Sequence, residues 1–449
     1  MANRSETYAA LVREGDLSPE SVAELYSSEI PAEAWRAVVM LLVVLAFQGY
    51  AAAIPTIAAP WFSKDFNLSQ PEMAHVFAGF ALSSFGALAL ARMADRVGRR
   101  RVLSWSAVAM PIAALCAALS RDVILFVASI VAVEAFLGAA LACSVVMLAE
   151  LLPIARRADG QSWAGLATAV GGGLCVFLAP VYSGFEISWR WLMAIPVAGI
   201  AVLPMVVRSI PESARWERLI SENGGRTTHF YDIFARPYRR RSITIIVCSL
   251  LAAFSAEGVN SYSYFHAVSV VGLSADFASA FTIVGGGLGM IGFPIGAWAS
   301  EQFGRVRTIV VCGTITSIVA LAYFWGPPIH FEHPAIWLGG AFLLMNATTN
   351  ATLVASNAAV TELFPTALRG TILGWFALMA AFGALTAERT IARFAFATAG
   401  VSVITGWLSL LGISGVILFG MLIEETRGLS LDTTADQLDP RDKRNQSNP

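Results

Sequence analysis

Two acidic side chains interrupt long apolar stretches of the chain. Glu134 stands about twelve residues into one apolar block and Glu257 about fifteen residues into another. An ionised acid in the middle of a membrane costs roughly 2.5–3.5 kcal/mol on insertion scales, and burial favours the protonated form. A carboxyl group that exchanges a proton at this depth is suited to proton coupling. A hydrogen-bonded structural acid, or direct binding of a cationic substrate, would also explain each residue.

Neutral polar side chains lie at similar depths in other apolar blocks. Together with the two acids they form the candidate substrate and proton site: Gln48, Tyr50, Asn260, Tyr264, Asn346 and Asn350. Hydrogen bonding between helices, at about 0.6 kcal/mol on average, would explain any one of them. The whole set favours a polar cavity. Because no Arg or Lys stands at this depth, the cavity favours protons, cations or a neutral polar solute.

Long apolar helices must hold these residues in place. Of the 449 residues, 56% are hydrophobic and 14% are charged, whereas soluble domains carry roughly 25% charged residues. A large soluble helical core is disfavoured, because so many apolar blocks leave too few amphipathic faces for water. Twelve blocks are long enough to cross a bilayer as helices: 37–60, 72–93, 102–120, 123–148, 163–183, 190–208, 242–266, 275–299, 308–326, 335–359, 371–393 and 399–422.

Charged motifs between the blocks repeat along the chain. Residues 95–101 read Asp-Arg-Val-Gly-Arg-Arg-Arg, and residues 301–307 read Glu-Gln-Phe-Gly-Arg-Val-Arg. The sequence Glu-Leu-Leu-Pro at 150–153 returns as Glu-Leu-Phe-Pro at 362–365, with nearly the same separation as the first pair of motifs. Two halves with matching charged motifs indicate a transporter that arose by duplication.

Loop charge predicts the orientation and the segment boundaries. With both termini cytoplasmic, only five of the 30 basic residues lie outside, which satisfies the positive-inside rule. We expect no cleavable signal peptide, and a short amphipathic helix beginning near Leu17. The expected segments are a cytoplasmic N-terminal extension (1–36), a first six-helix bundle (37–208), a cytoplasmic linker (209–241), a second six-helix bundle (242–422) and a cytoplasmic tail (423–449).

These motifs resemble the major facilitator superfamily. Residues 95–100 are similar to its signature between spans 2 and 3, and 301–307 to the weaker echo between spans 8 and 9. Residues 211–216 and 424–428 resemble the motifs that end each half in its sugar-porter and organic-ion branches. The resemblance covers about residues 36–431. It implies an all-α membrane protein whose twelve transmembrane helices form two pseudo-symmetric six-helix bundles, with spans 1, 4, 7 and 10 lining a central cavity.

The resemblance also implies a gate at the cytoplasmic face. Gly98 permits the positive φ of a tight interhelical turn, and Asp95 should pair with Arg157, with Glu150 beside it. We expect these charged residues to latch the outward-open state, although simple topology marking would also explain the basic ones. The expected gate residues are Asp95, Arg96, Arg99, Arg100, Glu150 and Arg157 in the first half, and Glu301, Arg305, Glu362 and Arg369 in the second.

The sequence favours a secondary active transporter for proton-coupled uptake of a small organic solute. The alternatives are a drug or metabolite efflux antiporter and, from another class, a sensor with a transporter fold. No metal motif, nucleophile elbow or clustered acid–base set suggests an enzyme. We expect no cofactor, no metal and no nucleic-acid partner, and a monomer in the inner membrane. His75 and His266 are interpreted as surface histidines, and the glycine runs at 171–173 and 285–289 as points of close helix approach or bending.

Overall fold

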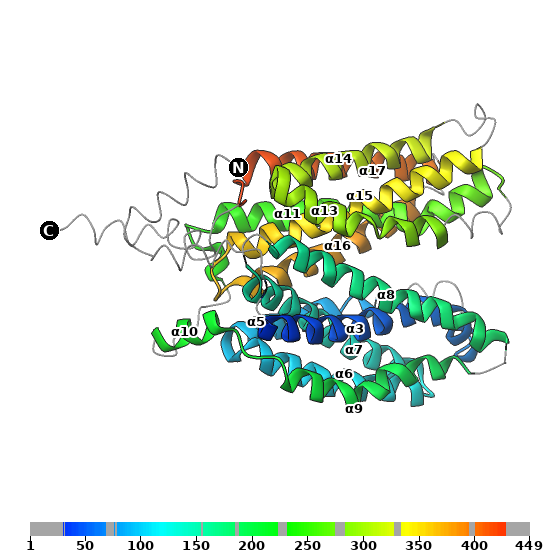
Figure 1. Cartoon of the computed structure of the whole chain (residues 1–449). Helices are drawn as coiled ribbons and strands as arrows, with labels where there is room; N and C mark the ends of the chain where they lie inside the picture. Colours follow the sequence, from blue (N-terminus) through cyan, green and yellow to red (C-terminus); the bar gives the residue numbers. More distant parts are fainter. Residues whose placement is uncertain are drawn as a thin grey trace.

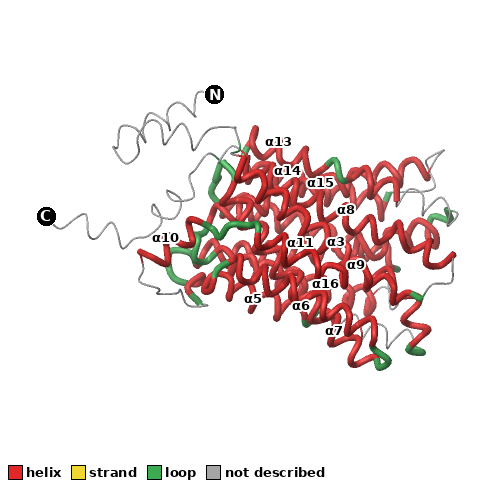
Figure 2. The backbone as a smooth tube through the Cα atoms, turned by 60° about the horizontal axis from the view of Figure 1, so that its bottom comes forward, coloured by secondary structure: helices red, strands yellow, loops and turns green. Residues whose placement is uncertain are grey.

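The computed structural model describes residues 30, 32–68, 76, 79–153, 156–184, 188–222, 231–273, 283–326, 334–394 and 400–427. Within these residues every regular element is a helix (Figure 2). The amphipathic helix expected near Leu17, the side chain of His75 and the last part of the expected tail lie outside the described residues.

Each of the twelve expected spans contains a described helix. In the first half they are α3 (Ala32–Asp65), α5 (Ser83–Val97), α6 (Arg99–Leu119), α7 (Val123–Leu151), α8 (Arg157–Gly184), and η2 (Trp189–Met193) continuing into α9 (Ala194–Arg208). In the second half they are α11 (Arg239–Phe265), extended by the π-helix η4 (His266–Val270), then α13 (Gly292–Phe303), α14 (Arg305–Trp325), α15 (Pro334–Leu363), α16 (Arg369–Phe394) and α17 (Val401–Leu422). Between the halves lie α10 (Ala214–Glu222) and η3 (Asp232–Phe234).

Ten of the described helical segments are long and apolar enough to cross a membrane. The described part of α5 is too short to qualify, at 15 residues. Helix α15 has 30 residues but is not among the ten, because Asn346, Asn350 and several threonines lower its hydropathy. The polar character of this helix places hydrogen-bonding groups inside an apolar bundle.

The helices form two bundles that lie side by side (Figure 1). In the first bundle α3 packs along α8, and α6 packs between α7 and α9. In the second, α11 packs against α16 and α17, and α14 against α15 and α17. The bundles meet where α5 contacts α16 and where α8 contacts α13. This arrangement confirms the prediction of two six-helix bundles.

The second and eighth spans each contain a tightened turn. At Ala81–Leu82 the Leu82 amide donates to the Gly79 carbonyl at 3.0 Å, and at Met290–Ile291 the Ile291 amide donates to the Leu288 carbonyl at 3.1 Å. Hydrogen bonds of this three-residue spacing interrupt a regular α-helix. The helix is therefore tightened just before α5 and just before α13, while Leu82 and Ile291 keep helical dihedral angles.

Two glycines connect α5 and α13 to the next helices. Gly98 has a φ of 106° and Gly304 a φ of 105°, backbone conformations that glycine adopts without steric cost. The structure confirms the positive φ predicted for Gly98. A side chain at either position would also overlap a carboxylate, that of Glu212 at Gly98 and that of Glu425 at Gly304. We call the end of the molecule that contains these two turns the basic end.

The opposite end of the first bundle is held by one arginine. Arg190 donates to Asp65 Oδ2 at 2.5 Å and to the Ser120 carbonyl at 3.0 Å, and its guanidinium lies 4.7 Å from the centre of the Trp189 ring. Burial raises the pKa of Asp65, but the hydrogen bonds from Trp189 and Arg190 outweigh it, and the pKa is lowered overall. These contacts join the ends of α3 and α6 to the start of η2.

Only one glycine of the 171–173 run serves close packing. A side chain at Gly171 would overlap the Ala46 carbonyl of α3, and one at Gly49 would overlap the Thr168 carbonyl of α8. Gly173 faces open space. The expectation of close approach is therefore confirmed for Gly171 and does not extend to its neighbour two residues later.

We predict that Gly171→Ala lowers the free energy of unfolding by about 1–3 kcal/mol, because a methyl group forces α3 away from α8. Gly173→Ala is the matched control from the same helix and should unfold like the unsubstituted protein. Thermal unfolding of the purified protein in detergent measures both. Equal melting temperatures for the two variants would contradict the close packing of α3 on α8.

Candidate functional site

Four arginines are buried at the basic end. Arg99, Arg157, Arg305 and Arg369 are each at most 2% exposed. Removing a guanidinium from water is unfavourable unless carboxylates and carbonyls replace the lost hydrogen bonds. The partners of these four residues therefore determine how this end of the molecule is held together.

Within each half, one arginine pairs with two acids of its own half. Arg99 Nη1 lies 3.5 Å from Glu150 Oε2, and its Nη2 lies 3.7 Å from Asp95 Oδ1. In the second half Arg305 Nη2 lies 3.2 Å from Glu362 Oε1 and 2.7 Å from Glu301 Oε1. The two halves thus repeat the same pairing, at positions that the sequence repeat relates to each other.

A further carboxylate in each half caps the helix that follows the glycine turn. Glu212 accepts from the Arg99 amide at 3.1 Å and the Arg100 amide at 3.2 Å. Glu425 accepts from the Arg305 amide at 2.7 Å and the Val306 amide at 3.1 Å. Free amides at a helix start attract negative charge, so each acid stabilises the turn before it.

The residue after each capping acid donates a hydroxyl hydrogen bond. Ser213 Oγ donates to Glu150 Oε2, and Thr426 Oγ1 donates to Glu362 Oε2 at 2.6 Å. The gate expected from the sequence did not include the capping acids or these two hydroxyl residues. The Glu-Ser pair at 212–213 and the Glu-Thr pair at 425–426 have nearly the separation of the other repeated motifs, and this is the signal that could have identified them.

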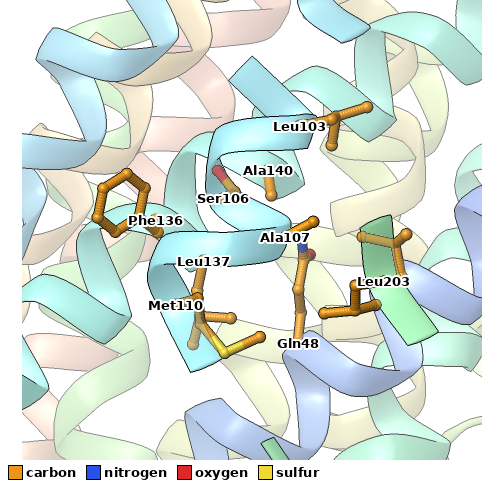
Figure 3. Close-up of a pocket in the computed structure, with 10 residues that line it drawn as sticks. Gln48, Leu103, Ser106, Ala107, Met110, Phe136, Leu137, Ala140 and Leu203 are labelled. Atoms are coloured by element: carbon orange, nitrogen blue, oxygen red, sulfur yellow. The ribbon is translucent and has the colours of Figure 1, made fainter. Parts of the chain in front are cut away.

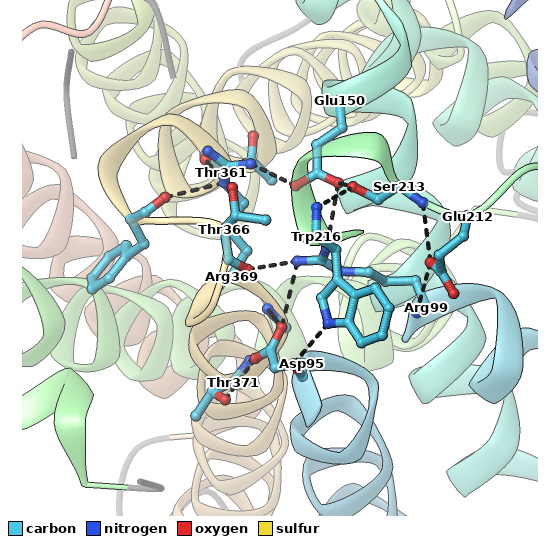
Figure 4. A network of polar contacts seen from close by, with 12 residues as sticks. Asp95, Arg99, Glu150, Glu212, Ser213, Trp216, Thr361, Thr366, Arg369 and Thr371 are labelled. Carbon is cyan, nitrogen blue, oxygen red and sulfur yellow. Dashed lines mark hydrogen bonds and ion pairs between the residues drawn. The ribbon is translucent and has the colours of Figure 1, made fainter. Parts of the chain in front are cut away.

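The remaining two arginines cross between the halves. Arg369 Nη1 lies 2.6 Å from Glu150 Oε1 (Figure 4). Arg157 Nη1 lies 4.0 Å from Glu362 Oε1. Arg99 Nη2 also donates to the Thr366 carbonyl of the second half at 2.5 Å. Each of the two crossing arginines therefore neutralises an acid that belongs to the other bundle.

Asp95 is held by the start of a helix in the other half. Its Oδ1 accepts from the Gly370 amide at 3.1 Å, and its Oδ2 accepts from the Thr371 amide and hydroxyl, both at 2.7 Å. The expected pairing of Asp95 with Arg157 is corrected: Arg157 lies against Glu362, and α16 supplies the donors to Asp95. Trp216 covers this contact by donating from Nε1 to the Asp95 carbonyl at 3.0 Å.

The equivalent contact in the other direction has different chemistry. When the two halves are aligned on their repeated Glu-Leu motifs, Ala158 and Asp159 of α8 stand where α16 has Gly370 and Thr371. Asp159 has a carboxylate in place of the threonine hydroxyl, and it pairs with Arg156 at 2.7 Å. The acid equivalent to Asp95, Glu301, has Arg305 as its described partner. The two halves are therefore joined asymmetrically.

Arg96 and Arg100 occupy different surroundings from the rest of the expected gate. Arg96 is exposed. Arg100 Nη2 donates to the Arg208 carbonyl at 2.9 Å, which joins α6 to the end of α9 within the first half. A role for either residue between the halves stays a prediction.

The expected midplane residues lie at one depth. Glu134 belongs to the middle of α7, which ends at the basic end, and Glu257 belongs to α11, which begins there. Gln48 lies near the middle of α3, and Asn346 near the middle of α15. Roughly five helical turns separate each of these residues from the basic end, which corresponds to about 25 Å.

Two of these polar positions contact the spans that contain the tightened turns. Ser83, the first residue of α5, donates from Oγ to Glu134 Oε2 at 3.0 Å. Asn350 donates from Nδ2 to the Gly289 carbonyl at 3.1 Å, next to the tightened turn before α13. Asn346 Nδ2 donates to the Phe342 carbonyl of its own helix at 2.9 Å. Glu134 and Asn350 therefore each bind the neighbouring span of their own half.

The other expected site residues lie apart from these contacts. Glu257 is half-buried, and Tyr50 is buried where α3 packs on α8. Gln48 points into a pocket inside the first bundle, against α6. Asn260 and Tyr264 belong to α11, but their side chains lie outside the described part of the structure. The described side chains thus share a depth without forming one cluster.

His266 is buried, so its interpretation as a surface histidine is wrong. It is 1% exposed, and its Nδ1 lies 2.6 Å from Ser402 Oγ. Its ring packs 5.4 Å from the Tyr323 ring and 5.1 Å from the Phe324 ring. It joins the end of α11 to α14 and the start of α17. Among the described residues no group of His, Cys, Asp and Glu could hold a metal ion.

Comparison with known proteins matches most of the chain to one family and to proteins with related names. The family model described as Major Facilitator Superfamily matches residues 39–388. The chain is 25% identical over 355 residues to the gentisate transporter of Corynebacterium glutamicum, covering 76% of this chain and 77% of that protein. It is 28% identical over 193 residues to the gallate transporter of Pseudomonas putida, covering 42% of each.

Solved structures show the same fold. The proton:xylose symporter XylE, bound to 6-bromo-6-deoxy-D-glucose, superposes with a TM-score of 0.72 at 18% sequence identity. The match covers 92% of this chain and 100% of that one.

We predict that Asp95→Asn speeds amide hydrogen exchange at Gly370 and Thr371. Hydrogen bonds to a charged group contribute about 1.5–3 kcal/mol, so exchange should rise roughly ten- to a hundredfold. Hydrogen-exchange mass spectrometry of the start of α16 measures it.

Glu425→Gln is the matched control. It should speed exchange at Arg305 and Val306 and leave the start of α16 unchanged. Unaltered exchange at Gly370 and Thr371 in the Asp95→Asn variant would contradict the capping of α16 by Asp95.

Proposed function

We propose that this chain, which belongs to the Major Facilitator Superfamily, imports a small aromatic carboxylic acid together with a proton. Membership makes the chain a multi-pass membrane protein and a secondary transporter rather than an enzyme. The observation that carries the finer proposal is the match to a gentisate transporter across about three quarters of both proteins. The shorter match to a gallate transporter supports the same substrate class, a hydroxylated benzoate.

We assign proton coupling to Glu134. This half-buried carboxyl lies at mid-depth in α7, where an ionised acid is unfavourable, and it accepts a hydrogen bond from Ser83. Protonation removes its charge. Because the proton and a carboxylate carry no net charge together, the proton concentration gradient supplies the driving force, roughly 1.4 kcal/mol for each tenfold difference. Glu134 therefore links the proton gradient to the conformation of the first bundle.

Uptake together with a proton also explains how the transporter can carry an anionic solute without a basic residue at mid-depth. The sequence has no Arg or Lys at the depth of Glu134 and Asn346, which by itself favours a neutral solute or a cation. An aromatic acid that enters together with a proton moves as a pair without net charge. Amide groups such as that of Asn346 can donate to a carboxylate without carrying charge themselves.

We place the basic end at the cytoplasm, since loops rich in Arg and Lys remain inside. With Asp95 capping α16 and Arg369 bound to Glu150, the halves are joined on this side, and the site would open to the outside. Rocking of the halves around a mid-depth site exchanges the two openings. The contacts between the halves must break on each transport cycle.

Uptake by proteoliposomes tests the substrate and the coupling. We expect radiolabelled gentisate to accumulate when the outside is more acidic than the inside, and an uncoupler to abolish the accumulation. Unlabelled gallate should compete, whereas D-xylose should not. If the proteoliposomes take up xylose but not gentisate, the substrate is a sugar and not an aromatic acid. If the proton gradient drives gentisate out of the compartment that protons enter, the protein is an efflux antiporter.

We predict that Glu134→Gln abolishes accumulation driven by the proton gradient and preserves exchange of labelled for unlabelled solute, because the amide cannot carry the proton. Glu217→Gln, the same change at an exposed position of α10, should behave like the unsubstituted transporter. Gradient-driven accumulation at the normal rate in the Glu134→Gln variant would refute the assignment of Glu134.

A further inference from the structure

A small pocket lies inside the first bundle, away from the contact between the halves (Figure 3). Residues of helices α3, α6, α7 and α9 line it. Most of its wall is apolar: Val44, Leu103, Ala107, Met110, Phe136, Leu137, Ala140 and Leu203. The two exceptions are Gln48 from α3 and Ser106 from α6. The pocket is therefore an apolar chamber with two polar side chains.

Both polar side chains are deeply buried, and the described part of the structure offers neither of them a partner. Gln48 is 5% exposed and Ser106 is 4% exposed. Neither Gln48 Oε1 and Nε2 nor Ser106 Oγ has a hydrogen-bond partner in the described part of the chain. Buried polar groups in native proteins nearly always have a partner, because an unsatisfied one loses its hydrogen bonds to water without replacement. Three buried polar atoms without a partner in one pocket indicate that a bound molecule supplies their hydrogen bonds.

We propose that this pocket binds an internal water molecule that bridges Gln48 and Ser106. About 10 Å³ of the pocket can hold the centre of a water molecule, close to the roughly 10–15 Å³ needed for one. Internal waters make about three hydrogen bonds, and the chamber offers two acceptors or donors from Gln48 and one from Ser106. In this conformation the space is too small for a transported solute.

The water connects α3 and α6, because the two polar side chains that line the pocket come from these helices. Gln48 lies on the first span and Ser106 on the third, and the water supplies the hydrogen bonds that connect them. Because the lining residues Leu103, Met110 and Leu203 offer no strong partner, the water has only the polar side chains to bind. The Gln48 side chain is then hydrogen-bonded to this water inside the first bundle when no solute is bound.

Oxidative labelling of Met110 tests the proposal. Brief X-ray exposure produces hydroxyl radicals from water, including water bound inside a protein, and methionine next to such water is oxidised to its sulfoxide. Met110 lines the pocket and is 2% exposed. Met345 of the second bundle is equally buried, also at 2% exposed, and serves as the internal reference. We expect Met110 to be oxidised faster than Met345 in the intact transporter.

Two variants connect this oxidation to the bridging water. Gln48→Leu removes the amide at similar size, and Ser106→Ala removes the hydroxyl; either should reduce Met110 oxidation toward the rate of Met345. Ser144→Ala removes an equally buried hydroxyl of the same bundle, also without a described partner, and should leave Met110 oxidation unchanged. Should Gln48→Leu fail to fold, Ser106→Ala alone gives the result. Slow Met110 oxidation in the intact protein, or unchanged oxidation in both variants, would overturn the proposal.

Discussion

The buried carboxylates of Asp95 and Glu150 depend on donors that belong to the other half of the chain. Taking a carboxylate out of water costs several kcal/mol unless hydrogen bonds and positive charge replace the solvent. Here α16 and Arg369 supply them, but only while the halves touch at the basic end. When the halves separate, water can take over the same groups. A polar contact of this kind can open and close, whereas a large apolar contact would resist opening.

The sequence predicted the positions of these charges but not their partners. A nearly constant spacing along the chain relates each charged residue to its equivalent in the other half. It carries no information about which residues of the two halves face each other. The crossing of Arg369 to Glu150 depends on how the bundles dock, so pairing by resemblance gave Asp95 the wrong partner. The turn at Gly98 depends on local backbone geometry, and it was predicted correctly.

The sequence predicts how deep in the membrane these polar residues lie, but not the direction in which each side chain points. Counting residues along apolar blocks placed Gln48, Glu134 and Asn346 at one level, and the helix bounds agree. In a helix that is apolar on all sides, the sequence pattern gives no preferred face. The orientation of Gln48 toward α6, away from the other bundle, became visible only in the packed structure. Likewise, the burial of His266 follows from its neighbours on α14 and α17.

Helix α5 joins the two parts of the molecule that have to act in concert. It has 15 residues, about 22 Å at the usual rise. Its first residue, Ser83, binds Glu134, and Asp95 near its other end binds α16. A single helix of about four turns therefore spans the distance between the carboxyl assigned to proton coupling and the contact between the halves. Protonation at one end and docking at the other act on the same element of the backbone.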